Sequence, residues 1–286
     1  MSLSRVTSPN PGRDQFSRNV PLALVVEHVG ETNREPKMGD RSSIEWTEAT
    51  WNPTTGCDRT SPGCDNCYAL TLAKRLKAMG VEKYQNDGDV RTSGPGFALT
   101  LHPEALDVPS RWGAPRTVFV NSMSDLFHDS VPLEFILQVF EVMKSTPRHT
   151  YQILTKRSKR LVQLSTQIEW PANVWMGVSI ENDRYAFRAN HLRDVPAAVR
   201  FLSVEPMLGP VPSLNLAGID WVIAGGESGP RARSLDVQWV TDLRDQCLTE
   251  NVAFFFKQWG GRTPKAGGRH LDGRTWDEYP SIPAAV

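Results

Sequence analysis

The chain has 286 residues, 40% of them hydrophobic and 22% charged, with 32 acidic and 32 basic side chains. A chain of this size buries roughly three quarters of its unfolded surface, which excludes a peptide hormone, a disulfide-stapled miniprotein and a wholly disordered regulator. The zero formal charge argues against a generally basic nucleic-acid coat, although it allows a local basic patch. No apolar run reaches the roughly 18–20 residues of a membrane span, and the first residues lack a convincing signal-peptide cleavage site, so we expect a cytoplasmic protein without membrane contact.

Residues 1–37 are expected to form a flexible N-terminal extension, because serine, proline, asparagine, glycine and mixed charges occur there with little periodicity. Residues 38–286 carry the regular patterns and are expected to fold as a single domain.

A cysteine-rich loop follows a first candidate strand at Ile44–Trp51. Cys57, Cys64 and Cys67 lie within eleven residues, whereas Cys247 stands alone. The spacing of the last two lets both thiolates reach one metal centre from a tight turn, and clustering of this kind in a reducing compartment points to a metal. Three thiolates around a four-iron cluster leave one iron without a protein ligand, where a small molecule can bind.

Zinc is the competing interpretation of this loop. A structural zinc site needs four closed ligands, and the loop supplies three. His102 or His128 would have to complete the set, because Cys247 falls on a helical apolar stripe typical of core packing. The sequence therefore favours an iron–sulfur cluster over zinc, and either metal over three unrelated buried thiols.

The rest of the chain alternates strand-like apolar runs with helical patterns. Helical stripes occur in Pro132–Ser145 and Asp236–Glu250, the second behind a capping aspartate. The strand-like runs are Phe97–Leu101, Thr117–Asn121, Thr150–Thr155, Val174–Ser179, Arg200–Val204, Trp221–Ala224 and Val252–Lys257. Strand, helix and strand at this spacing predict βαβ units, and hence an α/β fold that forms a complete or partial (β/α) TIM-like barrel; an open doubly wound sheet is the other possibility.

Most of these apolar runs end in a polar cluster. The clusters are Asn121–Asp125, Thr155–Arg157, Ser179–Asn182, Ser203–Pro206, Gly225–Ser228 and Lys257–Trp259. In parallel α/β architectures the carboxyl ends of the strands converge on one mouth, so we expect these clusters to face one site. A basic run follows the predicted strand Thr150–Thr155. In this run Lys156 falls at the strand end, while Arg157, Lys159 and Arg160 are expected to begin a solvated helix.

Several of these motifs resemble radical S-adenosylmethionine (SAM) enzymes of the spore photoproduct lyase type. They are the cysteine loop, Tyr68 with the helix Leu70–Lys77, Ser124-Asp125, Leu154-Thr155-Lys156 and Gly177-Val178-Ser179, in that order. From about Ser43 to Pro280 the chain is similar to a phage-associated family of unknown function that carries this three-cysteine motif. Its strings include Trp51-Asn52-Pro53, Asn121–His128, Ser203–Pro206, Gly225–Gly229 and Phe256–Gly261.

The resemblance implies a barrel of the radical SAM type and a role for each matching residue. Cys57, Cys64 and Cys67 would hold a [4Fe-4S] cluster whose open iron is chelated by SAM. The cofactor-side residues would be Ser124 and Asp125 at its amino group or ribose, Lys156 at its carboxylate, and Ser179 and Tyr68 at further contacts.

The implied activity is that of a radical SAM enzyme, generating a 5′-deoxyadenosyl radical that abstracts hydrogen from a substrate in the barrel mouth. The implied partners are a flavodoxin- or ferredoxin-like reductant and a nucleic-acid or nucleotide substrate, in a bacterial or phage-infected host. Among the remaining polar residues, Lys257 and Glu205 are expected on the substrate side, and His128 is a candidate acid–base group.

Three features depart from the radical SAM pattern. The first two cysteines are separated by six residues instead of three, Asn66 stands where an aromatic residue often precedes the third cysteine, and Gly225-Gly226-Glu227 lies on a late strand. We therefore expect Glu227 to be substrate-side or structural. Two other function classes stay open: a zinc-stabilised nucleic-acid-binding protein without catalysis, and an iron–sulfur sensor.

Overall fold

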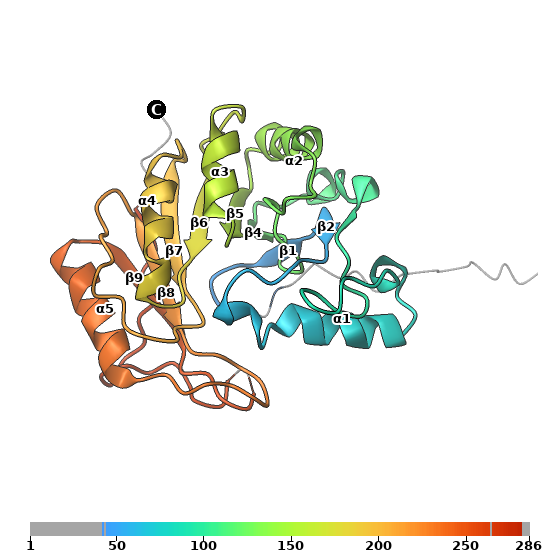
Figure 1. The fold of residues 1–286 in the computed structure, drawn as a ribbon. Coiled ribbons are helices and arrows are strands. Elements are labelled where there is room, and N and C mark those ends of the chain that lie inside the picture. Colours follow the sequence, from blue (N-terminus) through green and yellow to red (C-terminus); the bar gives the residue numbers. More distant parts are fainter. Residues whose placement is uncertain (1–41, 43, 264, 282–286) are drawn as a thin grey trace, which may run out of the picture. The chain divides into compact units, whose positions relative to one another are not determined.

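The computed structural model describes residues 42, 44–263 and 265–281, which belong to one compact unit, Met38–Val286. The extension expected at residues 1–37 lies outside the described residues. The centre of this unit is a seven-stranded parallel sheet (Figure 1). Its strands, in spatial order, are β1 (Ala49–Trp51), β4 (Thr117–Val120), β5 (Thr150–Thr155), β6 (Val174–Ser179), β7 (Val199–Val204), β8 (Trp221–Gly225) and β9 (Ala253–Gln258).

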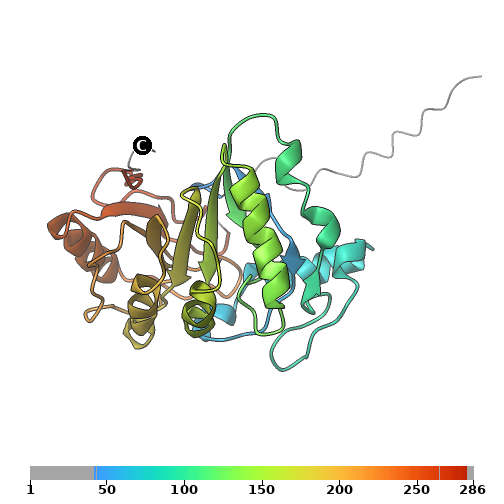
Figure 2. The same cartoon turned by 90° about the horizontal axis from the view of Figure 1, so that it is seen from above.

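The order of the strands identifies the sheet as a partial barrel. Each strand of this sheet pairs with the strand of the sheet that follows it in the chain, and in the described part of the chain β1 and β9 are the first and last strands of the order and do not pair with each other. The outer side of β9 is bordered by the segment after it, where the Phe256 N–H donates to the Trp276 carbonyl and Phe255 forms an antiparallel bridge with Asp277. The helices are α1 (Tyr68–Ala78), α2 (Leu133–Ser145), α3 (Ser158–Ser165), α4 (Phe187–Arg193) and α5 (Val237–Thr249). Helices α2 to α5 cover one face of the sheet (Figure 2) and pack on it in one core. The predicted α/β fold with a partial (β/α) barrel is therefore confirmed.

The two faces of the sheet carry different side chains, because successive residues of a strand point to opposite faces. The outer face packs aliphatic groups such as Val120, Met176 and Val222 against the helices. The inner face carries an aromatic layer, made of Trp46, Phe119, Trp175, Phe201, Trp221 and Phe255. Gly177 leaves room for this layer, since a Cβ there would lie 2.4 Å from the Phe201 ring.

The same alternation fixes which residues occupy the carboxyl ends of the strands on the inner face. Beyond the aromatic layer, towards the carboxyl ends of the strands, the alternation places the following residues on the inner face: Lys156, Ser179, Ser203, Glu205 and Lys257. A polar layer therefore lies at the mouth of the half-barrel, above an aromatic interior.

One predicted strand is wrong. Of Phe97–Leu101, only Thr100–Leu101 (β3) is extended, and it pairs antiparallel with β2 (Thr54–Thr55) outside the main sheet. Phe97 instead packs with Tyr84 in a small core beneath α1. The first predicted strand is shortened to β1, because Trp46 turns into the inner aromatic layer.

The connections contain short 3₁₀ helices, namely Pro62–Cys64, Glu82–Tyr84, Pro103–Ala105, Pro109–Arg111 and Asp183–Tyr185. Helix α5 begins at the expected cap, where the Asp236 side chain accepts from the Gln238 N–H. Every described helix is too short or too polar to cross a membrane.

Candidate functional site

The cysteine loop lies across the carboxyl ends of several strands. At its start, directly after β2, the Gly56 N–H donates to the carbonyl of Met123, which lies just after β4, at 3.0 Å. Past its middle, Ser61 Oγ donates to Glu181 Oε1, just after β6, at 2.5 Å. Near its end, Asn66 Nδ2 donates to Glu227 Oε2, just after β8, at 2.9 Å. The loop is therefore anchored at three points around the mouth, and its thiols lie at the end of the barrel that the sequence predicted.

The three thiols of this loop are half-buried. Burial raises the pKa of both Cys57 and Cys67, and the charge of Cys64 adds to this at each of them, so Cys64 is close to both. The 3₁₀ helix Pro62–Cys64 and the bond from the Cys67 N–H to the Cys64 carbonyl fold the last two cysteines into one turn. Burial, helped by the charge of Asp125, raises the pKa of Cys57 to about 12. Burial also acts on Cys64, but the Lys156 ammonium and nearby hydrogen bonds outweigh it and lower the pKa of that thiol.

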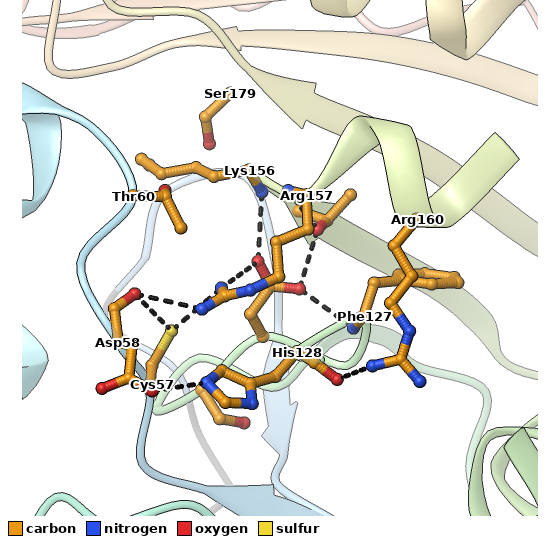
Figure 3. A network of polar contacts seen from close by, with 12 residues as sticks. Cys57, Asp58, Thr60, Phe127, His128, Lys156, Arg157, Arg160 and Ser179 are labelled. Carbon is orange, nitrogen blue, oxygen red and sulfur yellow. Dashed lines mark hydrogen bonds and ion pairs between the residues drawn. The ribbon is translucent and has the colours of Figure 1, made fainter. Parts of the chain in front are cut away.

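Arg157 donates a hydrogen bond to the first thiol, and its position differs from the one predicted from the sequence. It was expected at a solvated helix start, but only 9% of it is exposed. Its Nη1 donates to Cys57 Sγ at 3.3 Å and to Asp125 Oδ2 at 3.2 Å, and its Nη2 donates to the Asp58 carbonyl at 3.2 Å (Figure 3). These acceptors turn the side chain inward, while Lys159 is exposed as expected.

Asp125 is buried, and protein donors surround its carboxylate. Oδ1 accepts from Thr155 Oγ1 at 2.7 Å and from the Phe127 N–H at 3.0 Å. Oδ2 accepts from the Lys156 N–H at 3.1 Å and from Arg157 Nη1. A carboxylate has about four acceptor positions, so this one is saturated within the chain and joins the end of β4 to the end of β5.

Ser124 and Tyr68 are also engaged by the protein. Ser124 Oγ lies 2.7 Å from Thr54 Oγ1 and donates to the Thr54 carbonyl at 2.9 Å. The Tyr68 hydroxyl donates to the Ser122 carbonyl, which ties the start of α1 to the loop after β4. Both predicted cofactor-side residues therefore border the thiols while holding the loop in place.

His128 is buried beside the cysteine loop and supports it. Its Nδ1 accepts from the Ser130 N–H at 3.2 Å, which leaves Nε2 to donate to Asp58 Oδ2 at 2.9 Å. Partial burial of Asp58 opposes ionisation, but hydrogen bonds from Thr92 and His128 hold the pKa of its carboxyl below the usual value. His128 thus positions the residue that follows the first cysteine.

Lys156 and Ser179 lie at the mouth with their functional groups less committed. Lys156 Nζ is 3.7 Å from Glu181 Oε1, beyond hydrogen-bond distance, and the side chain is partly exposed. The Ser179 hydroxyl has no hydrogen-bond partner within the described residues, and it faces the Lys156 side chain in Figure 3. Lys156 therefore has an ammonium group that is partly exposed at the mouth, and the Ser179 hydroxyl lies beside it with only 1% of that residue exposed.

Glu205 and Lys257 are brought together as an ion pair on the inner face. Lys257 Nζ lies 2.6 Å from Glu205 Oε1, and each side chain is 18% exposed. They come from the ends of β7 and β9, and Gly225 of β8 lies between them: a Cβ there would be 3.4 Å from Lys257 Cβ and 3.5 Å from Glu205 Cδ. The absence of a side chain at Gly225 leaves space for the pair to meet over β8.

Glu227 of the late Gly-Gly-Glu motif clamps the cysteine loop. It accepts from Arg233 Nη2 at 2.6 Å and from Asn66 Nδ2 at 2.9 Å, and the same Arg233 nitrogen donates to the Pro62 carbonyl at 2.8 Å. Burial opposes ionisation of Glu227, but these donors lower the pKa of its carboxyl. Of the two roles expected for Glu227, this geometry corresponds to the structural one.

A second clamp is formed by Glu181, which is fully buried. It pairs with Arg188 Nη1 at 3.0 Å and accepts from Ser61 Oγ. Gly63 fits tightly against it, since a Cβ on Gly63 would lie 2.6 Å from Glu181 Cγ. Neither Arg188 nor Arg233 is predicted as a site residue from the sequence, because an arginine in a polar segment ordinarily faces solvent.

The side chains considered for a fourth zinc ligand are used elsewhere. His102 Nε2 lies 2.8 Å from Thr55 Oγ1 and its Nδ1 lies 3.2 Å from Glu104 Oε1, while Cys247 is buried in the core beneath α5, as expected. Across residues 44–263 and 265–281, no three His, Cys, Asp or Glu side chains are grouped closely enough to hold one metal ion.

The donor set nevertheless fits an iron–sulfur cluster. Thiolates are the protein ligands of such clusters, and a four-iron cluster binds each of them at a different iron. Three thiolates give such a cluster a net negative charge, and the cations Lys156 and Arg157 lie beside them. We therefore regard the three cysteines as suited to a cluster with one open iron.

Residues 41–280 match a family described as "Protein of unknown function (DUF5131)". The chain belongs to this family. The comparison with curated proteins gives no match. Among solved structures, a cysteine-to-alanine mutant of spore photoproduct lyase with dinucleoside spore photoproduct is similar at a TM-score of 0.43 and 14% identity, over 68% of this chain and 60% of that one.

A double mutant of the same lyase with bound AdoMet and dinucleoside spore photoproduct gives a TM-score of 0.41 and 14% identity, over 67% of this chain and 59% of that one. This chain thus spans about 60% of the length of those lyase structures. The predicted membership of a family of unknown function is confirmed. A similarity this remote to the lyase structures assigns no activity to the chain.

Proposed function

We propose that this protein is a radical SAM enzyme whose [4Fe-4S] cluster is held by Cys57, Cys64 and Cys67. The observation that carries the proposal is the placement of three half-buried thiols, in one clamped loop, over the polar mouth of a parallel half-barrel. The loop supplies three thiolates and leaves one iron open for SAM.

The cofactor side of the site is formed by Lys156 and Ser179. The Lys156 ammonium suits a carboxylate, and the Ser179 hydroxyl can donate or accept one hydrogen bond. When bound, a reduced cluster and SAM supply a 5′-deoxyadenosyl radical that abstracts hydrogen from a substrate. The chain's own contribution is to orient the ligands and to exclude water, which the aromatic layer around Phe201 does from below.

The substrate side of the site is formed by Glu205 and Lys257. Their ion pair is partly exposed at the mouth and holds a proton on Lys257 Nζ that can be passed to, or hydrogen-bonded by, a substrate. Lys257→Met and Glu205→Gln are expected to keep the iron content and the binding of SAM, whereas Lys156→Met weakens SAM binding at least tenfold. Loss of SAM binding in Lys257→Met would move that residue to the cofactor side.

We propose a nucleic acid or nucleotide as the substrate. Arg59, inside the cysteine loop, and Arg231, whose carbonyl accepts from Asn66, are exposed cations beside the mouth. Arginines so placed suit phosphate groups, and binding to a polyanion weakens as salt rises. Binding of a single-stranded oligonucleotide should fall with ionic strength and fall further in Arg59→Gln; salt-independent binding would contradict this substrate class.

Metal analysis of protein prepared without oxygen tests the proposed function. We expect a brown protein with about four irons and four sulfides per chain, reducible by dithionite or by a flavodoxin- or ferredoxin-like donor. A colourless protein with one tightly bound zinc would favour a nucleic-acid-binding protein without catalysis. A brown protein that never cleaves SAM would favour an iron–sulfur sensor.

A further inference from the structure

We propose that Arg157 sets the reduction potential of the cluster through its hydrogen bond to Cys57, and that Asp125 is the positioning residue that holds Arg157 in place. This inference rests on the proposed function, because it concerns the cluster on the three cysteines. It replaces the expectation that Asp125 contacts SAM, since its carboxylate is saturated by protein donors.

The guanidinium is fixed from three sides. Nη1 is shared between Cys57 Sγ at 3.3 Å and Asp125 Oδ2 at 3.2 Å, and Nη2 donates to the Asp58 carbonyl. The Arg157 side chain and the Asp125 side chain are each only 7% exposed. Arg157 cannot leave the thiol without breaking a buried ion pair, so its contact with Cys57 is a lasting feature of the site.

A buried donor at a cluster thiolate acts on the electron that the cluster receives. Reduction adds one negative charge to the cluster, and a cationic N–H directed at a ligating sulfur stabilises that added charge. Because water is excluded here, the interaction is stronger than at the surface. Removing Arg157 should therefore make the cluster harder to reduce.

The three thiols differ in the cation that acts on each of them. Cys64 receives the charge of Lys156, a residue with a partly exposed side chain, and Cys67 packs at the start of α1 in the small core beneath it. Within the described residues, only Cys57 receives a side-chain hydrogen bond from a buried cation. One corner of the cluster thus carries the strongest donor.

The test is an anaerobic redox titration of the reconstituted protein, followed by the electron paramagnetic resonance signal of the reduced cluster. At a fixed potential we expect Arg157→Met to lower the ratio of reduced to oxidised cluster about tenfold, which is about 59 mV for one electron. Arg157→Lys keeps the charge without the fork and should lie between the two. Lys159→Met, which removes an exposed cation from the first turn of α3, two residues after Arg157, is the matched control and should match the wild type.

A double-mutant cycle tests the role of Asp125. If Asp125 acts by holding Arg157, then Arg157→Met has a smaller effect in an Asp125→Asn background than in the wild type. Equal effects in both backgrounds would overturn the positioning role.

The outcomes separate this inference from the function on which it rests. A wild type that takes up no iron contradicts the proposed function. A wild type with a cluster, together with an iron-loaded Arg157→Met whose ratio stays within twofold of the Lys159→Met control, overturns this inference alone. Should Arg157→Met fail to load iron, Arg157→Lys decides the question, because an unshifted ratio in that variant overturns it as well.

Discussion

Arg188→Met should destabilise the protein strongly, because it leaves Glu181 buried without its main partner. Glu181 has no exposed surface, and the Arg188 guanidinium donates both to its Oε2 at 3.0 Å and to the Ser179 carbonyl at 2.8 Å. Breaking a buried ion pair from one side costs about 3–5 kcal/mol. Ser61 and the more distant Lys156 remain near Glu181, so we expect the lower end, about 3 kcal/mol in the free energy of unfolding.

The assay is urea unfolding of the reduced, metal-free protein, followed by tryptophan fluorescence. If the same variant is unfolded by heat instead, a loss of about 3 kcal/mol in a domain of this size corresponds to a melting temperature roughly 6–12 °C lower than that of the wild type. Arg184→Met, which removes an exposed arginine just before the same helix, is the control and should change the free energy by less than about 0.5 kcal/mol.

A second variant identifies the cause of the destabilisation. In the double variant Arg188→Met with Glu181→Leu, both charges are replaced by apolar groups, and most of the lost stability should return. Two results would contradict this role of the Glu181–Arg188 pair. One is that Arg188→Met unfolds at the same urea concentration as the Arg184→Met control; the other is that the double variant unfolds at a lower urea concentration than Arg188→Met alone.

Two further predictions concern the clamps on the cysteine loop. The pKa of Glu227 is lowered, so its pairing with Arg233 contributes stability above about pH 4.5, and this contribution is lost as the pH falls through the lowered pKa. Near pH 7 the melting temperature of the wild type should therefore exceed that of Glu227→Gln by an amount equivalent to about 1 kcal/mol. The plots of melting temperature against pH for the two proteins should converge in acid. Parallel curves would contradict this role of Glu227. Gly63→Ala places a Cβ against Glu181 and should at least halve the iron retained per chain. The control is Gly113→Ala, whose added Cβ meets no atom within 4 Å and which should retain the iron fully. Equal iron in the two variants would show that the close packing of Gly63 against Glu181 is unimportant for the loop.

Most of the sheet could be predicted from the sequence, because a parallel strand buried on both faces is a nearly continuous apolar run. The strands β5 and β6 begin and end at the predicted residues, and β7, β8 and β9 do so to within one residue. Phe97–Leu101 has the same composition but forms no such strand, because Phe97 packs beneath α1 and only Thr100–Leu101 pairs with another strand. Composition alone did not distinguish a buried loop from a buried strand.

The candidate site was partly predictable for a similar reason. Parallel strands bring their carboxyl ends to one edge, so the placement of Glu205 and Lys257 at one mouth could be predicted from their positions at two strand ends, but their ion pair could not. The partner of Arg157 did not follow, because Cys57 lies 100 residues away and only the closed fold brings them together. The same holds for Arg233, which reaches the carbonyl of Pro62 171 residues earlier.

The most direct test of the proposed enzyme is whether it cleaves SAM when it carries the cluster. The wild type, reconstituted without oxygen and reduced with dithionite, should release 5′-deoxyadenosine, detected by liquid chromatography and mass spectrometry. Cys57→Ala, Cys64→Ala and Cys67→Ala should release none, and Cys247→Ala, which alters the core beneath α5, should still do so. An iron-loaded wild type that releases no 5′-deoxyadenosine, or a loop variant that releases as much as the wild type, would contradict the account.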